Sequence, residues 1–306
     1  MTSREQVLVD VARWLENYNE LEAMLDMHVA YRFEPLVGEL AKKRRGPERA
    51  REAAKRARTA LDLRPDDSIR DICGLLEERG GVKVFPMHLA SDAFFGLSVA
   101  RDDGGPAVVV NVWDRISVER WVFSAAHELG HLLLHLGAYD AAQTEEDREE
   151  EGEANQFASH FLMPHELFVR EWDEARGLPL VDRVLKVKRI FRVSYRTVLY
   201  RLSEQEAYGK RIWQQFQVAY KARYGQSLGL TDEPAALSPG DFSAAMVESR
   251  AADEPKRLSR EDFIEDRLCR LVRSAFEKEL ISLGRAAEVL SIDIKTMRTI
   301  VSTWVE

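Results

Sequence analysis

The chain has 306 residues, of which 45% are hydrophobic and 31% are charged, and its formal net charge is −8. These values are typical of a globular protein with one sizeable core and one or two smaller units. No apolar run approaches the roughly 20 residues of a membrane-spanning helix, and the first residues lack the pattern of a secretory signal. We therefore expect a cytoplasmic protein without a membrane partner. The acidic balance disfavours a protein that coats nucleic acid with its whole surface.

The N-terminal region is predicted to be helical and then strongly basic. Residues 4–41 carry apolar positions at helical spacing. Residues 42–64 hold ten Lys or Arg against three acidic residues. A solvent-facing basic helix is the simplest interpretation, and contact with nucleic acid or an acidic partner is the alternative.

An α/β pattern begins near residue 65. A helix that begins with acidic residues is predicted to end at a glycine. The sequence GVKVFPM at 81–87 is then typical of a short strand. The segments 96–100 and 107–112 predict an antiparallel hairpin around a glycine-containing turn, with the second strand at the sheet edge. Ser117 is then expected to cap a helix whose apolar residues recur every three or four positions.

The remaining chain is predicted to be mainly helical. An acidic stretch leads into a helix that is interrupted at Pro164. Residues 180–205 and 281–304 each show a helix, a short turn and a second helix. Their Arg and Lys residues allow contact with DNA, which the net charge disfavours. Residues 225–260 have the Gly, Pro, Ser and acidic content of a linker.

The stretch HELGH at 127–131 places polar residues inside an apolar helical run. His127 and His131 lie one turn apart, about 40° around the helix axis, so both imidazoles can reach one metal ion. Glu128 is rotated about 100° from His127, so it stays off the metal but can contact a water held there. This pattern predicts a catalytic zinc site with Glu128 as general base.

A catalytic zinc ion needs a third protein ligand, for which three candidates follow in the sequence. His135 is two turns from His127, too far along the axis to share the ion without distortion. Glu151 lies on the same stripe of small residues as Asn155, so we favour Glu151 as the ligand and keep Glu153 as the alternative. Asn155 is then placed to hydrogen-bond a ligand imidazole and fix its tautomer.

HELGH followed by EGEANQFASHFLMP at 151–164 resembles the ImmA/IrrE family of metallopeptidases, over roughly residues 65–205. The resemblance implies a zincin-like fold of the thermolysin type, one zinc ion, and a DNA-binding repressor as the cleaved partner. In the family pattern the glutamate four residues before the asparagine binds the metal, which is Glu151 here. We therefore expect an α+β protein: a zincin-like metallopeptidase core with a small antiparallel or mixed sheet, flanked by mainly helical segments that include helix-turn-helix-like units.

Five segments are expected along the chain. They are a helical, basic N-terminal segment (1–64), the metallopeptidase core (65–170), a helix-turn-helix-like segment (171–224), a linker (225–260) and a C-terminal helical domain (261–306).

A peptidase of this kind also needs a strand that binds the substrate and a group that stabilises the oxyanion. A zincin binds its substrate as an added strand, and Val108 and Val110 lie on the candidate edge strand, although a core strand is an equal alternative. An additional oxyanion donor is also needed, and the sequence does not choose among its candidates, Tyr139, His160, His165 and Tyr195.

The predicted function is that of a zinc endopeptidase which cleaves a repressor or another transcriptional regulator in a stress, mobile-element or toxin–antitoxin-like circuit. The alternative is a non-proteolytic regulator that binds DNA or a protein partner and whose metal site is structural or vestigial.

Overall fold

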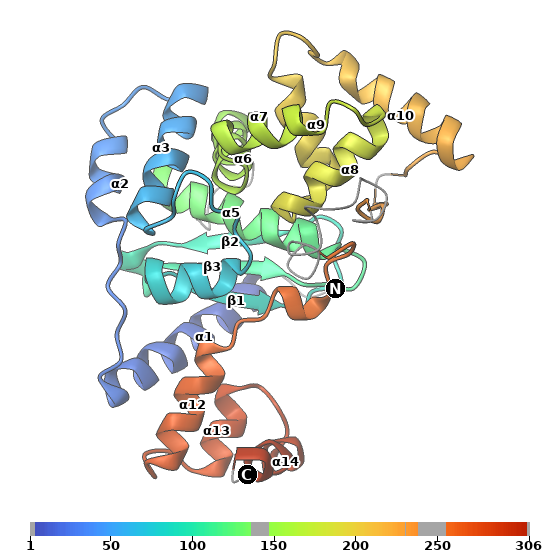
Figure 1. The fold of residues 1–306 in the computed structure, drawn as a ribbon. Coiled ribbons are helices and arrows are strands. Elements are labelled where there is room, and N and C mark those ends of the chain that lie inside the picture. The colour runs from blue at the N-terminus through green and yellow to red at the C-terminus, as the bar shows by residue number, and fades with distance from the viewer. Residues whose placement is uncertain (1–3, 136–146, 230, 238–254, 305–306) are drawn as a thin grey trace.

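A small mixed sheet lies at the centre of the molecule (Figure 1). The computed structural model describes residues 4–135, 147–229, 231–237 and 255–304. The strands are β1 (Lys83–Met87), β2 (Gly96–Val99) and β3 (Ala107–Asn111), in the order β1-β3-β2. β3 runs parallel to β1 and antiparallel to β2. This sheet, surrounded by helices, confirms the predicted α+β class.

The expected position of β3 at the sheet edge is wrong. The hairpin of β2 and β3 is present, but β1 pairs with the other side of β3, so Val108 and Val110 lie on the central strand. All residues of β3 are buried. A continuous apolar run is what a strand covered on both faces requires, whereas a half-exposed strand alternates. The backbone of Val108 and Val110 is therefore already paired and cannot receive a substrate strand.

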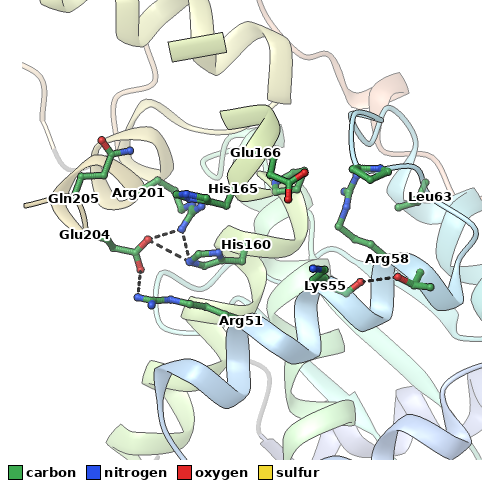
Figure 2. A pocket seen from close by; sticks show the side chains of 13 residues that line it. Arg51, Lys55, Arg58, Leu63, His160, His165, Glu166, Arg201, Glu204 and Gln205 are labelled. Carbon is green, nitrogen blue, oxygen red and sulfur yellow. Dashed lines mark hydrogen bonds and ion pairs between the residues drawn. The ribbon is translucent and has the colours of Figure 1, made fainter. Parts of the chain in front are cut away.

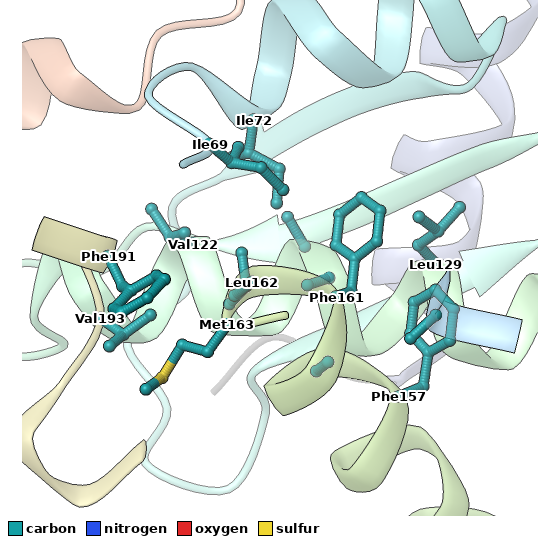
Figure 3. Packing of buried hydrophobic residues seen from close by; sticks show 14 of the residues in the cluster. Ile69, Ile72, Val122, Leu129, Phe157, Phe161, Leu162, Met163, Phe191 and Val193 are labelled. Carbon is teal, nitrogen blue, oxygen red and sulfur yellow. The ribbon is translucent and has the colours of Figure 1, made fainter. Parts of the chain in front are cut away.

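Two helices pack together on one side of the sheet and form the core of the site. Helix α5 (Val118–Leu134) contacts β2 and β3, and α6 (Arg148–Leu162) packs along α5. The Ser117 side chain accepts a hydrogen bond from the Arg120 backbone N–H, as expected for the N-cap. Figure 3 shows rings of α6, Phe157 and Phe161, packed in the same apolar cluster as Leu129 of α5.

The basic stretch forms a packed helix, which corrects the expectation of a fully solvent-facing one. Helix α3 (Pro47–Ala60) lies against α6. Its contact face consists of small buried residues, Ala50, Ala53, Ala54 and Ala57. Arg49 and Arg58 are also buried, at 5% and 4% exposure. Basic residues of this helix therefore belong to the interior as well as to the surface.

The predicted helix-turn-helix-like unit packs on the same core. It consists of α8 (Leu180–Phe191) and α9 (Tyr195–Ser203), which contact α10 (Arg211–Tyr224). Arg189 donates to the Leu237 carbonyl and Arg201 to Glu204, and both arginines are buried. Neither of them is presented to DNA.

The opposite face of the sheet belongs to a second apolar cluster. Ala107 and Val109 join this cluster, whereas Val108 and Val110 join the one around α5. Helix α1 (Arg4–Leu25) packs there against α12 (Arg267–Glu277) and α13 (Leu283–Val289), so the first helix and the C-terminal helices lie side by side (Figure 1). The five-segment division remains a prediction, and much of the expected linker lies outside the described residues.

The other helical elements complete the described chain. They are α2 (Glu34–Leu40), α4 (Ile72–Gly74), a π-helix (Leu75–Gly80), α7 (His165–Glu174), α14 (Ile294–Trp304) and two 3-10 turns (Arg101–Asp103 and Arg260–Asp262). Within these described ranges, every helix is too short or too polar to cross a membrane.

Candidate metal centre

Helices α5 and α6 bring His127, His131 and Glu151 together. The Nε2 atoms of the two histidines are 3.0 Å apart. Glu151 Oε2 lies 3.3 Å from His127 Nε2, and Glu151 Oε1 lies 3.1 Å from His131 Nε2. The three side chains form a compact set of two imidazole nitrogens and one carboxylate.

This donor set fits zinc. With zinc–ligand bonds of roughly 2.0–2.1 Å, the donor atoms at two corners of a tetrahedron lie about 3.3 Å apart, close to the separations found here. Two histidines and one glutamate are also the ligands of one established type of catalytic zinc site, which leaves one coordination position open. Spacing and chemistry agree, and these residues could hold a single zinc ion.

The ring of His127 is oriented by Asn155. His127 Nδ1 lies 3.2 Å from Asn155 Oδ1. An amide oxygen only accepts hydrogen bonds, so Nδ1 carries the proton and Nε2 keeps its lone pair for a metal. This is the contact that the spacing of Glu151 and Asn155 on one helix face predicts.

His131 is oriented by a longer chain of groups that the sequence did not reveal. Its Nδ1 lies 3.0 Å from His135 Nδ1, and His135 Nε2 lies 3.1 Å from Glu153 Oε2. A carboxylate accepts, so Nε2 of neutral His135 is protonated and its Nδ1 accepts from His131. The Nε2 atom of His131 is thereby left free to bind a metal.

Glu153 is occupied elsewhere, which argues against its alternative role as metal ligand. Its carboxylate accepts hydrogen bonds from the Gly46 backbone at 2.6 Å and from Arg49 Nε at 2.9 Å. Arg49 comes from α3, more than a hundred residues before Glu153. Only the packing of the basic helix against α6 makes this contact, so the local sequence pattern contained no signal for it.

Glu128 is buried at 7% exposure beside the start of β2. A Cβ atom at Gly96 would lie 2.8 Å from Glu128 Oε1 and 2.7 Å from the Val109 carbonyl oxygen. Glycine at position 96 therefore leaves the space that the Glu128 carboxylate occupies. The sequence predicted Glu128 but not its dependence on Gly96.

The charges at the centre reinforce one another. When the Nε2 atoms of His127 and His131 carry protons, their hydrogen bonds lower the pKa of Glu151, and a bound zinc ion would take the place of those protons. Burial opposes the charged form of His131, but the Glu151 hydrogen bond and nearby carboxylates raise its pKa. Burial lowers the pKa of His135, which favours its neutral form.

A cleft of about 1150 Å³ adjoins the centre. Its lining includes residues from α5, α6, α9 and the segment before β2. Among them are Phe95, Arg120, Asn155 and Tyr200. Tyr200 donates a hydrogen bond to Gln156, and Arg120 lies over the rings of Phe95 and Phe123. These two cleft residues were not singled out from the sequence.

The candidate oxyanion donors are not gathered in this cleft. His160 lies 3.3 Å from Glu204, outside the cleft lining, and His165 lines a different cavity. Tyr195 is fully buried against Phe216. Tyr139 lies outside the described residues.

Residues 77–203 match the family model of the IrrE N-terminal-like domain, peptidase family M78. This match confirms the predicted resemblance of this part of the chain to the ImmA/IrrE family of metallopeptidases. No curated protein matches the chain significantly. Among solved structures, a Mycobacterium tuberculosis transcriptional regulator is 22% identical, with a TM-score of 0.36, over 51% of this chain and 46% of the regulator. The chain spans about half of that regulator's length, and a TM-score this low does not establish a shared fold.

Proposed function

We propose that this protein is a zinc-dependent endopeptidase that cleaves a DNA-binding repressor or another transcriptional regulator. The observation that carries the proposal is the juxtaposition of His127, His131 and Glu151. Glu128, whose charge acts on His131, is not among these three donors. A purely structural site has no use for an additional buried carboxylate.

Each residue of the site has a distinct task in this proposal. Zinc, when bound, acts as a Lewis acid and lowers the pKa of water towards about 7. Glu128 takes the proton of the attacking water and passes it to the leaving amine. Asn155 and His135 keep the Nε2 lone pairs of His127 and His131 directed at the ion. Burial of Glu128 strengthens its interaction with the water by excluding competing solvent.

The substrate is proposed to bind along the free edge of β2. β2 pairs with β3 on one side, and no strand among the described residues pairs with its other side. An extended peptide can add to such an edge through backbone hydrogen bonds. The contact of α5 with β2 and the short distance between Gly96 and Glu128 support the proposal that this edge lies beside the base.

A regulatory role agrees with the proposed substrate. Cleavage of a repressor would switch transcription in a stress, mobile-element or toxin–antitoxin-like circuit, and a cytoplasmic location would give access to it. The non-proteolytic alternative has one observation in its favour, because Lys295 and Arg298 of α14 are exposed on the second helix-turn-helix-like unit.

The decisive experiment is Glu128→Gln, tested on the purified protein with the product of the adjacent regulatory gene as substrate. We expect zinc content to be retained and cleavage to fall by at least 1000-fold. Glu149→Gln, an exposed change on α6, serves as the matched control and should cleave normally. Full cleavage by Glu128→Gln would exclude Glu128 as the base. No cleavage by the wild type, together with salt-dependent, sequence-specific DNA binding, would favour the non-proteolytic alternative.

A further inference from the structure

A second cavity, of about 740 Å³, lies outside the proposed zinc site. Its walls come from α3, from the end of α6 with the start of α7, and from the end of α9 (Figure 2). A volume of this size is typical of a site for a small molecule. None of the proposed zinc ligands lines it.

The wall formed by α3 is cationic. Arg51, Lys55 and Arg58 follow one another at intervals of four and three residues, which places them on one face of the helix. Arg201 of α9 lines the cavity from the other side. Four Lys or Arg side chains thus face two glutamates, Glu166 and Glu204, in a protein whose net charge is −8.

The acidic residues of the cavity compensate these cations only in part. Glu204 pairs with Arg201 at 2.5 Å, with His160 at 3.3 Å and with Arg51 at 3.8 Å. Arg51 also pairs with Glu48 at 3.1 Å, whereas Lys55 has no ion pair with a described residue. Arg58 donates to three backbone carbonyls, those of Phe161, Arg64 and Asp67, and to no carboxylate. Burial lowers the pKa of Arg58 to about 10, as expected for a cation without close ionic compensation.

Two arginine nitrogens at the cavity are buried without a hydrogen-bond partner among the described residues. They are the Nε atoms of Arg51 and Arg201. The Arg201 side chain is only 2% exposed, so water cannot freely satisfy it. An unsatisfied buried donor destabilises the protein, which favours a ligand whose oxygen atoms accept hydrogen bonds from these guanidinium groups.

The lining also has an apolar part, which includes Leu63, Pro65 and Pro164. A ligand that complements both parts carries a phosphate or carboxylate group and a compact apolar body. Guanidinium groups suit both anions because they donate paired hydrogen bonds. Nucleic acid fits less well, because these cations line a hollow and not an extended ridge.

We propose that this cavity binds a small organic anion, with Arg51, Lys55 and Arg201 contacting the anionic group. Isothermal titration of the full chain at low salt with phenyl phosphate and with benzoate tests this and separates the two anion classes. At least one of them should bind at a single saturable site. Neutral benzamide, which keeps the ring but lacks the charge, should bind at least tenfold more weakly.

The variants are chosen to spare the fold. Lys55 is exposed and makes no ion pair with a described residue, so Lys55→Glu should fold normally and weaken anion binding at least tenfold. Arg51→Gln should also weaken it. Lys42→Glu makes the same charge change at an exposed site outside the cavity and should bind within twofold of the wild type.

Three results would overturn the proposal. They are the absence of saturable binding of either anion to the wild type, unchanged affinity in Lys55→Glu, and an equal loss of affinity in Lys42→Glu.

Discussion

At the residue scale, the two imidazoles of the proposed zinc site are held by different partners. Asn155 on α6 orients His127, whereas His135 and Glu153 orient His131. His135 extends the histidine series by one more turn of α5 but contacts only the outer side of His131. It is therefore a positioning residue in the proposed site.

Replacement of His135 tests this role. His135→Ala removes the acceptor for His131 Nδ1, and loss of such an outer partner typically costs 10–100-fold in metal affinity. We expect a decrease of that size in a competitive chelator titration. His88→Ala, at a half-exposed histidine outside the site, is the control and should bind zinc as the wild type does. Unchanged zinc affinity in His135→Ala would show that His135 does not position His131 for zinc binding.

A second residue, Glu77, is predicted to make stability depend on pH. Its carboxylate accepts hydrogen bonds from the Tyr18 hydroxyl at 2.9 Å and the Val84 backbone at 3.2 Å. Burial, together with nearby Glu265, raises the pKa of Glu77 to about 9. The folded state therefore holds a proton that the unfolded state releases near pH 4.5, so this group's contribution to stability falls as pH rises from about 4.5 to 9.

Glu77→Gln keeps the acceptor oxygen and removes the charge. The free energy of unfolding of the variant should exceed that of the wild type by about 1–3 kcal/mol at pH 8, and the difference should vanish near pH 4.5. Urea unfolding at both pH values measures this. Glu78→Gln is an exposed control on the same π-helix. A Glu77→Gln effect that is the same at both pH values would show that Glu77 is ionised throughout.

At the element scale, the close approach of α5 and α6 creates the site. A Cβ atom at Gly130 would lie 3.0 Å from the Phe157 ring and 3.3 Å from Ala154 Cα. The glycine of HELGH and the alanine before Asn155 therefore let the helices touch. This contact sets the distance between Glu151 and the two histidines.

Gly130→Val should push α6 away from α5. We expect a loss of about 1–3 kcal/mol in unfolding free energy from overpacking, with at least tenfold weaker zinc binding because Glu151 moves with α6. Gly38→Val, an exposed glycine with open space around it, makes the same change without a clash. Normal zinc affinity in a folded Gly130→Val variant would contradict the dependence of the site on this packing.

Helical periodicity was sufficient to predict α5 and α6, because both are amphipathic, and the Ser117 cap also predicted the start of α5. The local sequence pattern did not predict that β3 lies at the centre of the sheet. A run of valines is compatible with either an edge strand or a central strand until its neighbouring strands are known. The basic helix was misjudged for a similar reason. Its arginines dominated the pattern, whereas Ala50, Ala53, Ala54 and Ala57 determine which face is buried.

At the scale of the whole molecule, helix α1 and the C-terminal helices α12 and α13 pack together on one face of the sheet. Arg267 of α12 pairs with Glu22 of α1 at 2.5 Å, and Lys83 of β1 lies 3.0 Å from the same carboxylate. All three side chains are nearly buried. Residues about 240 positions apart in the sequence meet here, so no local pattern could have predicted the contact.

Arg267→Ala tests how far this packing stabilises the protein. Removing one partner from a buried ionic cluster costs about 3–5 kcal/mol, because the remaining charges lose compensation. Arg270→Ala on the same helix breaks the exposed pair with Glu78 and should cost less than about 1 kcal/mol. Thermal and urea unfolding compare the two. Similar small losses in both variants would mean that this packing contributes little to stability.

The central claim is that one zinc ion is held between α5 and α6. Anomalous diffraction at the zinc absorption edge, from crystals grown with one equivalent of zinc, tests it most directly. We predict a single peak at roughly 2.0–2.2 Å from His127 Nε2, His131 Nε2 and a Glu151 carboxylate oxygen, with Glu128 outside the first coordination sphere. A zinc ion bound by Glu153 or Glu128 in place of Glu151, or located away from both histidines, would contradict the account.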